Sequence, residues 1–226
     1  MGLKTAQQIM DGAWTKVNEQ TGGAAVRWPA AEGLMWFNNG MLEIVNQMPS
    51  ANSKRAAPTV ASGSRQDFSG LNITDGLQWI DVVCNIGSGG ARGRPIRKAE
   101  RAWLDDNMPG WHTVTAPEAT TWVHDPRDPK AFYLYPNPAS GTKIEAIYAA
   151  APTAATNPAS AWPLDDVYAN ACEAFILYSF YSKDATYTKN PQLASAYWSL
   201  FLSMVGARGQ NLAGMAGVGD RKAGGA

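Results

Sequence analysis

The sequence predicts an α+β protein, in which an antiparallel helical bundle is built from the N- and C-terminal helices and an antiparallel β domain, a sandwich or a barrel, is inserted. Three observations lead to this prediction. Apolar residues recur at helical spacing near both ends of the chain, short β-branched and aromatic runs fill the middle, and turn residues separate those runs. The expected boundaries are 1–50 and 160–206 for the bundle, 51–159 for the inserted β domain and 207–226 for a flexible C-terminal arm.

Two N-terminal helices are predicted from their start and stop signals. Thr5 and Gln8 have the spacing of a capping box, and the helix that follows should end at a Gly-Gly pair. Pro29 is typical of the first turn of a second helix, and Pro49 should end it. The apolar face of this second helix comprises Leu34, Phe37, Met41, Ile44, Val45 and Met48.

The middle of the chain has the character of strands. The segments "LQWIDVVCNIG", "TTWVHD", "AFYLYPNP" and "TKIEAIYAAAP" are short and rich in β-branched and aromatic residues. The residues "NPASGT" between the last two of them predict a hairpin-type loop. Because no long helices separate these strands, we expect antiparallel pairing, interrupted by a short helix around "KAERAWLDDN".

Helical signals return in the last third of the chain. Asp165 and Asp166 place negative charge at a helix start, where it complements the helix dipole. A second helix should begin with Asn190 as its cap and Pro191 in its first turn, and should end at Gly206. A short polar connection predicts that the two helices form an antiparallel hairpin. The apolar stripe of the second helix is Leu193, Tyr197, Leu200 and Met204.

The composition points toward association and away from membranes. The 19 basic and 19 acidic residues cancel, so no net charge draws the chain to nucleic acid or to a membrane surface. No apolar run reaches the roughly 20 residues of a membrane span, and no secretory signal is evident, so we expect a soluble protein made inside a cell. Cys84 and Cys172 lie far apart in apolar runs, which is typical of free thiols in a reducing compartment.

Residues that could form a catalytic or metal site are few. His112 and His124 do not have metal-ligand spacing with the cysteines. The adjacent aspartate pairs lie near helix ends, where capping explains them better than an acid–base dyad does. The segment "NIGSGGARGRP" follows a strand but lacks the Gly-Lys-Ser/Thr of a phosphate loop. We therefore expect no catalytic residue, no metal and no cofactor.

A basic cluster follows this glycine-rich segment. Its members are Arg92, Arg94, Arg97, Lys98 and Arg101. One interpretation is a solvated sheet edge, since Lys and Arg protect exposed strands from pairing with another chain. The other is contact with an acidic partner or with the phosphates of passing DNA. No base-reading motif accompanies the cluster, so sequence-specific recognition of DNA is not expected.

The C-terminal segment "GARGQNLAGMAGVGDRKAGGA" is rich in Gly and Ala. It carries three cations and one acid and has no apolar periodicity, so it cannot by itself offset the entropy lost on ordering. An arm of small residues is suited to threading into a groove on a neighbouring subunit. A dangling terminus fits the composition equally well.

Four longer segments resemble one protein family. They are "RWPAAEGLMWFNNGMLEIVNQMPSA", "GRPIRKAERAWLDDNMPGWH", "HDPRDPKAFYLYPNP" and "PLDDVYANACEAFILYSFYSKDATYTKNPQLASAYWSLFL". Together they resemble the head-to-tail adaptor (connector) proteins of tailed bacteriophages, particularly of short-tailed ones. The resemblance runs from about Trp28 to Met204 and keeps the order of elements.

The resemblance implies a structural virion protein that is assembled in the host cytoplasm. Such adaptors form a ring, usually of twelve subunits, beneath the portal, and DNA passes through the central lumen during genome ejection without any catalysed step. The implied partners are the portal protein, the tail nozzle or tube protein, tail fibres, further copies of the chain and, without sequence specificity, double-stranded DNA.

The resemblance also implies roles for particular residues. The hairpin core would be the apolar stripe of the last helix, with Trp198 left for a neighbouring subunit. The loop Gly87–Arg94 would face the tail component or the lumen, together with the cations Arg92, Arg94, Arg97 and Lys98. The portal-binding residues would be Gly206, Arg208, Gln210, Asn211, Leu212, Met215, Arg221 and Lys222.

Two other functions are compatible with the sequence. One is a tail-associated carbohydrate- or fibre-binding module. Its stacking surfaces would be Trp79, Trp103, Trp111 and Trp122. The other is a hydrolase with a site in the β domain, whose turnover would depend on His124 or Asp125.

Overall fold

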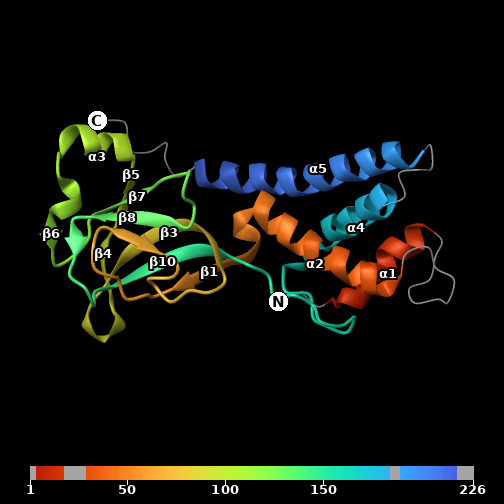
Figure 1. Ribbon diagram of the computed structural model, residues 1–226, viewed down its shortest axis with the longest axis horizontal. Helices are drawn as coiled ribbons and strands as arrows, with labels where there is room; N and C mark the ends of the chain where they lie inside the picture. The colour runs from red at the N-terminus through yellow and green to blue at the C-terminus, as the bar shows by residue number, and fades with distance from the viewer. Residues whose placement is uncertain (1–3, 18–28, 184–188, 218–226) are drawn as a thin grey trace. The chain divides into compact units, whose positions relative to one another are not determined.

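The structure is a computed structural model that describes residues 4–17, 29–183 and 189–217 (Figure 1). The chain divides into two compact units, which we call the helical unit, Met1–Ala51 with Pro152–Ala226, and the β unit, Asn52–Ala151. The described residues contain five α-helices and ten strands. This mixture of helix and sheet agrees with the predicted α+β class.

Helices α1 and α2 begin at the predicted signals. Helix α1 spans Ala6–Lys16, and its capping box is formed: the Gln8 amide donates to Thr5 Oγ1 at 3.3 Å and the Thr5 amide donates to Gln8 Oε1 at 2.9 Å. Helix α2 spans Ala30–Gln47, directly after Pro29. The predicted apolar face of α2 is buried except for Leu34, which is half-buried. The Gly-Gly pair expected to end α1 lies outside the described residues.

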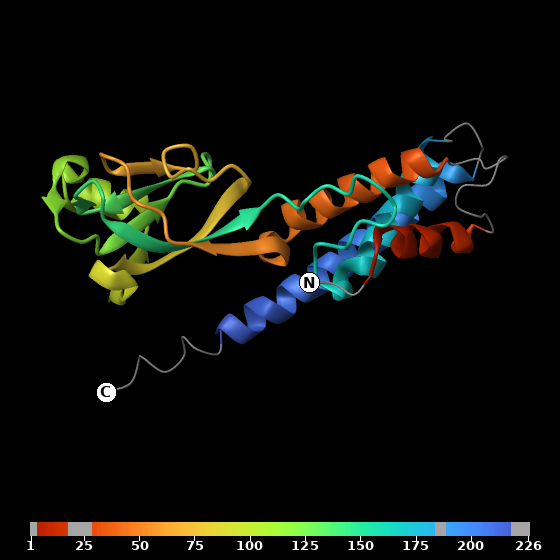
Figure 2. The same cartoon turned by 90° about the horizontal axis from the view of Figure 1, so that it is seen from below.

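Helix α4 is the centre of the helical unit. It spans Ala169–Lys183 and follows the 3₁₀ turn η4, Asp166–Tyr168, which Asp165 caps by accepting a hydrogen bond from the Val167 amide at 3.1 Å. Helices α1, α2 and α5 all pack on α4 (Figures 1 and 2), so most of its circumference is buried. Its buried residues are Ala169, Ala171, Cys172, Glu173, Ala174, Ile176, Leu177 and Phe180.

Helix α5, Asn190–Gly217, packs on α4 through a different face from the one predicted. The expected core residues Leu193, Leu200 and Met204 are 39%, 41% and 38% exposed. The buried residues lie one position further along the chain, about 100° around the helix axis. They are Ala194, Phe201 and Val205. The prediction was wrong because apolar side chains occur on several sides of α5, so their spacing alone could not identify the side that meets α4.

Aromatic side chains fill the contact between α4 and α5. Phe201 packs edge-on against Phe175 with ring centroids 5.6 Å apart, and Trp198 lies 5.1 Å from Tyr178. Trp198 is therefore half-buried inside the helical unit, and is only in part exposed to a neighbour. The half-buried Tyr197 stacks on Tyr181 at the edge of the same contact.

Helix α5 also runs further than predicted, because Gly206 does not end it and the helix continues to Gly217. A glycine ends a helix when it takes a left-handed conformation just past the last turn. Gly206 does not take that conformation, so it costs some helix stability without breaking the hydrogen-bond ladder. The first part of the arm expected to be flexible is thus helical, and residues 218–226 lie outside the described part of the chain.

The β unit contains two open four-stranded sheets and a two-stranded one. The first sheet has the order β1-β10-β3-β4, with bounds Ser53–Ala56, Lys143–Ala150, Gly76–Ile86 and Arg92–Pro95. The second has the order β2-β8-β7-β5, with bounds Arg65–Asp67, Ala131–Tyr135, Thr121–His124 and Arg97–Ala99. The third pairs β6, Thr115–Ala116, with β9, Asn137–Pro138.

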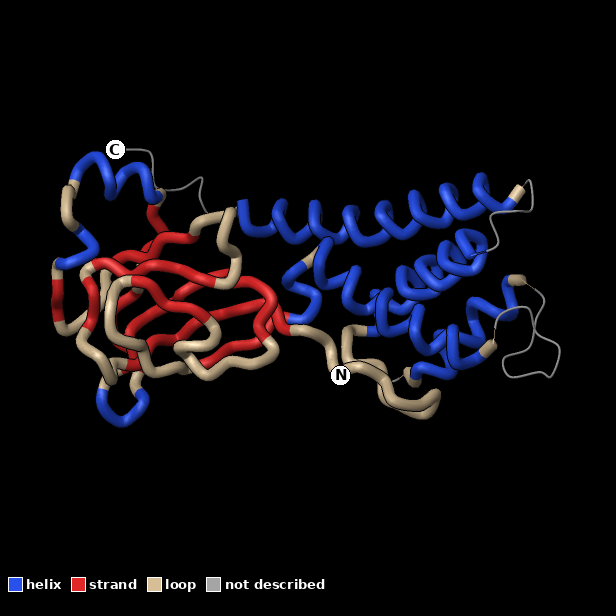
Figure 3. Tube along the Cα trace, in the orientation of Figure 1, coloured by secondary structure: helices blue, strands red, loops and turns tan. Residues whose placement is uncertain are grey.

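The sheet pairing corrects three expectations. The described strands do not close into a barrel, and the pairs β5–β7 and β6–β9 are parallel. The residues "NPASGT" do not form a hairpin loop, because β8 and β10 lie in different sheets. This segment, which includes β9, instead carries the chain from one sheet to the other, within the β unit, whose strands are red in Figure 3.

The two four-stranded sheets share one core. Trp79 of β3 stacks on Phe68 at 4.2 Å and meets Phe132 of β8 edge-on at 4.8 Å, so the sheets pack against each other through aromatic side chains. The short helix α3, Arg101–Asn107, forms where a helix was expected. Its Leu104 packs against Val123 in a second, smaller core.

Candidate partner-binding surfaces

The predicted tail- or lumen-facing cations lie on two edge strands and not in one loop. Residues 88–90 form a short 3₁₀ turn, after which Arg92 and Arg94 lie on β4 at the edge of the first sheet. Arg97 and Lys98 lie on β5 at the edge of the second sheet. All four side chains are exposed, so the sequence correctly identified a basic surface but not its construction.

Arg92 is neutralised by an acid that the sequence analysis did not single out. Glu145, in the middle of β10, accepts hydrogen bonds at 2.8 Å from Arg92 on one edge of the sheet and from Arg55 on the other. The Glu145 side chain is only 10% exposed. Burial alone would raise the pKa of this carboxyl, but the two guanidinium groups hold it below its ordinary value.

Cys84 lies beneath the same carboxylate. Its Sγ donates to Glu145 Oε2 at 3.6 Å, and the side chain is buried. Burial, and then the adjacent negative charge of Glu145, raise the pKa of the Cys84 thiol. A thiolate is the reactive form of cysteine, so Cys84 is held in its unreactive state. Cys172, on α4, is likewise a buried free thiol.

The Glu145 ion pairs predict a pH-dependent stability. Because the folded-state pKa of Glu145 is depressed, the unfolded chain takes up this proton first, near the ordinary pKa of about 4.3. The stabilisation is therefore present at neutral pH and is lost as pH falls through the folded-state pKa. In thermal unfolding followed by circular dichroism, Glu145→Gln should lower the Tm at pH 7 and should differ little from the wild type at pH 3.

Glu118 offers a matched control for this measurement. It is exposed, and it forms no ion pair within the described residues. Glu118→Gln should therefore leave the pH dependence of the Tm as it is in the wild type. An equal loss of Tm for Glu145→Gln at pH 7 and at pH 3 would contradict the assigned role of the two arginines.

Two cations of the basic cluster, Arg94 and Arg97, have neither an ion pair nor a ring contact among the described residues. The others are engaged locally. Lys98 lies over the ring of Trp122 at 5.4 Å, and Arg101 pairs with Asp125 at 3.3 Å and with Asp105 at 3.4 Å. The net positive charge of this surface therefore rests on the edges of β4 and β5.

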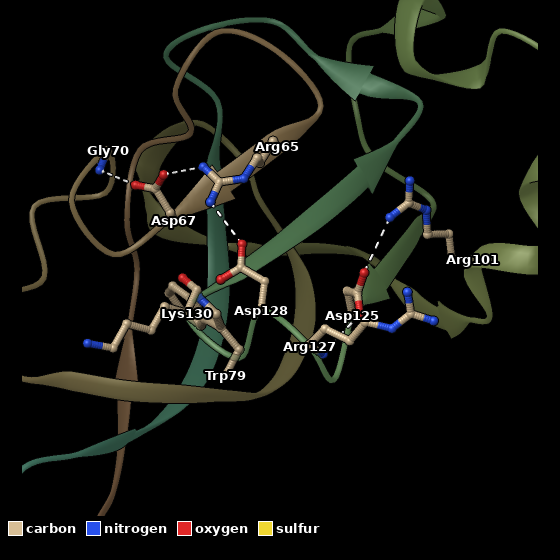
Figure 4. Close-up of polar contacts among 9 residues, drawn as sticks. All are labelled: Arg65, Asp67, Gly70, Trp79, Arg101, Asp125, Arg127, Asp128 and Lys130. Atoms are coloured by element: carbon tan, nitrogen blue, oxygen red, sulfur yellow. Dashed lines mark hydrogen bonds and ion pairs between the residues drawn. The ribbon is translucent and has the colours of Figure 1, made fainter.

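The loop between β7 and β8 is fixed by ion pairs and backbone hydrogen bonds (Figure 4). Arg65 on β2 bridges Asp67 at 2.6 Å and Asp128 at 3.0 Å. The Gly70 amide, and then Arg65, hold the pKa of Asp67 below its ordinary value. Since Asp128 belongs to the loop and Arg65 to a strand, these contacts tie the loop to the second sheet.

The same loop is held at both of its ends. Asp125 accepts hydrogen bonds from the Arg127 amide at 3.0 Å and from Arg101 at 3.3 Å. The indole of Trp79 donates to the Lys130 carbonyl at 3.0 Å. The side chains of Arg127 and Lys130 are exposed and point out of this hydrogen-bonded loop, so the loop presents two cations on the surface of the β unit.

Three of the four tryptophans predicted to stack on carbohydrate are buried, so the prediction is wrong for those three. Trp79, Trp111 and Trp122 are 3%, 1% and 1% exposed, because they form the cores of the β unit. Trp103 on α3 is 52% exposed. Stacking on a sugar requires open aromatic faces, so this set provides one such face and not four.

The two histidines do not make the contacts of a hydrolytic site. The Nδ1 atom of His124 is buried without a hydrogen-bond partner, and burial, followed by the charge of Lys98, lowers the pKa of this ring. Asp125 pairs with Arg101 and makes no hydrogen bond to His124. His112 Nδ1 lies 3.0 Å from Ser64 Oγ, but no carboxylate among the described residues orients the ring.

The described residues contain no group of three His, Cys, Asp or Glu side chains arranged to hold a metal ion. Nor does any helix in the described ranges have the length and hydropathy to cross a bilayer.

The predicted portal-binding residues fall on the second half of α5 or beyond it. Six of them lie between Gly206 and Gly217, whereas Arg221 and Lys222 are outside the described residues. Within the part of the chain that the structure describes, no atom lies within 4 Å of where a Cβ would stand on Gly206 or Gly209, so α5 has open space beside these two residues. The six residues are Gly206, Arg208, Gln210, Asn211, Leu212 and Met215.

The exposed apolar faces of α2 and α5 were not predicted from the sequence. Met35 and Leu42 on α2 are 52% and 41% exposed, and Leu200 on α5 is exposed to the same degree as Leu42. A signal was present in the sequence, because residues 190–207 contain no Asp, Glu, Lys or Arg. A helix face that stays in water usually carries charges.

The whole chain fits one family. The family model described as SU10 adaptor protein matches residues 4–222. The chain belongs to the SU10 adaptor family. This confirms the resemblance to phage head-to-tail adaptors, which the sequence analysis based on four segments. No curated protein matches the chain.

Membership of the SU10 adaptor family gives the uncovered surfaces a context. An SU10 adaptor is a structural component of a phage virion and associates with portal and tail components. The candidate contact surfaces are therefore those on which the chain leaves apolar or charged side chains exposed. They are the outer faces of α2 and α5, the end of α5, the basic edges of β4 and β5, and the fixed β7–β8 loop.

Proposed function

We propose that this SU10 adaptor forms a ring between the portal and the tail nozzle or tube, with twelve subunits as is usual for adaptors of this type. The ring lines the channel through which DNA leaves the head. Residues 1–50 and 160–206 act as a helical bundle directed to the portal. Residues 51–159 act as an inserted β domain directed to the tail. No catalytic step and no cofactor are part of this function.

The observation that carries the proposal is the length of α5. This helix has 28 residues, whereas its main partner α4 has 15. At Gly206 and Gly209 no described atom lies within 4 Å of where a Cβ would stand, so this side of the helix is open. A helix end with several glycines and an open side is marginal in water, and a partner that covers it would stabilise it. We assign that partner as the portal.

The basic surface of the β unit fits the proposed channel or the tail contact. Arg94 and Arg97 carry positive charge and have no acidic partner among the described residues, and phosphate binding needs charges of this kind. The contact would be independent of sequence, since the cluster presents no base-reading element. Tail fibres remain a further candidate partner for the exposed Trp103.

Deleting Gly206–Ala226 tests the portal assignment. Val205, the last residue of α5 that is buried among those whose burial is described, stays in the shortened chain, so the helical unit should keep its fold and its Tm. We expect binding to purified portal of the same phage to weaken by more than about tenfold, measured by biolayer interferometry. The variant Arg94→Ala/Arg97→Ala is the matched control, because it changes the β unit and should bind portal as the wild type does.

The outcomes separate clearly. Unchanged portal binding by the shortened chain would overturn the assignment of residues 206–226. Failure of the full-length chain to bind portal, and to form rings in electron micrographs with or without portal, would overturn the proposed function itself.

A further inference from the structure

The outer face of α5 is apolar and free of charge. Leu193, Leu200 and Met204 are spaced seven and four residues apart, so they lie on one side of the helix. Each of these side chains is between 38% and 41% exposed. Because residues 190–207 include no charged side chain, no salt bridge or solvated charge interrupts this face. We call these three residues the α5 face.

Helix α2 presents a second face of the same kind. Met35 and Leu42 are 52% and 41% exposed, and Asn39 lies between them on the same side. Both acids of α2 are engaged within the helical unit: Glu32 pairs with Lys183 of α4, and Glu43 accepts a hydrogen bond from Gln47. We call Met35 and Leu42 the α2 face.

The two faces match in spacing. Met35 and Leu42 are seven residues apart, as are Leu193 and Leu200, which corresponds to about 10 Å along each helix. Equal spacing lets the side chains of one helix fit between those of the other, as in ordinary helix packing. None of the five side chains of the two faces is charged, and Glu32 beside the α2 face is already paired with Lys183.

The two faces belong to different helices, each of which packs on α4. If two copies paired through their α5 faces alone, the α2 face of each would take no part in that contact. If the α5 face of one copy packs on the α2 face of the next, every contact buries both faces, and each copy can continue the series. A partner of another kind that covered one face would leave the other exposed.

We propose that the α5 face of one copy packs on the α2 face of the next copy, as the helical contact between neighbours. This inference rests on the proposed ring, for which it names the surface and its polarity. Five side chains cover only part of a stable interface, which usually buries about 800 Å² on each partner. They are the apolar centre of the contact, where most of the binding energy lies.

Single substitutions at matched positions test the inference. Leu42 and Leu200 are both 41% exposed, and Val114 in the β unit is 43% exposed. We expect Leu42→Glu and Leu200→Glu each to raise the concentration at which rings form by more than about tenfold in mass photometry, since each buries a charge against an apolar face. Val114→Glu should assemble as the wild type does.

Mixing the two variants tests the polarity. Leu42→Glu keeps an intact α5 face, and Leu200→Glu keeps an intact α2 face, so one molecule of each can pair through the intact faces. The damaged faces then block further growth. The equimolar mixture should therefore form two-subunit complexes and nothing larger, while each variant alone stays monomeric.

Every other outcome overturns the inference. Normal assembly of Leu42→Glu would mean that α5 pairs with itself or with another protein, and normal assembly of Leu200→Glu with loss of portal binding would make the α5 face a portal site. A mixture that stays monomeric would exclude the α2–α5 contact. If circular dichroism shows that a Glu variant has lost its fold, Leu42→Gln and Leu200→Gln replace the pair.

This experiment also separates the inference from the proposed function. If the wild type forms rings and both Glu variants form them equally well, only the assigned contact is overturned. A wild-type chain that stays monomeric at high concentration, with and without portal, would overturn the ring and this contact together.

Discussion

Gly33→Ala should destabilise the helical unit by about 2–3 kcal/mol, because the site is already filled. A Cβ at Gly33 of α2 would stand 2.1 Å from Cη2 of Trp14, far inside van der Waals contact. Trp14 is 1% exposed and packs edge-on against Phe180 of α4 at 4.7 Å, so its ring has no space into which to move. Urea unfolding followed by helical circular dichroism would measure the change.

Gly206→Ala is the control for this substitution. Gly206 also lies within a helix, but nothing is within 4 Å of its Cβ position. Here the substitution should stabilise α5 by up to about 1 kcal/mol, because alanine favours the helix over glycine. If both substitutions had the same sign, the close approach of α1 and α2 at Gly33 would not be the reason that glycine is needed there.

Phe201→Ala should cost about 3–5 kcal/mol, whereas Leu200→Ala should cost less than about 1 kcal/mol in the dilute monomer. Phe201 is fully buried in the α4–α5 contact, and removing its ring would leave a cavity beside Phe175. Leu200, the adjacent residue, is 41% exposed and loses little packing when it is shortened. The midpoints of urea unfolding at a concentration below assembly would compare the two.

The comparison of these neighbours tests the orientation of α5 directly. The stripe predicted from the sequence required the opposite order, with Leu200 in the core. A larger loss for Leu200→Ala than for Phe201→Ala would restore that prediction and would contradict the buried face of α5 described above. It would also remove the α5 face as a surface for a neighbouring copy.

Prediction succeeded where the signal is local. The capping box of Thr5 and Gln8 needs only residues within one turn, and it forms as expected. The start of α2 after Pro29 and the start of α5 at Asn190 are likewise set by backbone restrictions next to those residues. The family, too, was evident from the order of segments along the chain.

The candidate surfaces were predicted only in part, because their charge pairing and burial depend on residues that are distant in sequence. The sequence showed that Arg92, Arg94, Arg97 and Lys98 form a basic surface, but it could not show that Arg92 is neutralised. Its partner Glu145 is 53 residues away in sequence and becomes a neighbour only when β10 and β4 enter the same sheet. The burial of Trp79, Trp111 and Trp122 depends in the same way on how the sheets pack.

The sequence by itself determined the helices, the main strands, the scarcity of reactive groups and the family, because each depends on composition, on nearby residues or on their order. Only the tertiary structure decided which side of α5 is buried, which sheet each strand joins and which charges are paired. These depend on contacts between distant segments, and helix α5 shows why. Several of its sides are apolar enough to be buried, and the shape of α4 selects one of them and leaves another exposed to a partner.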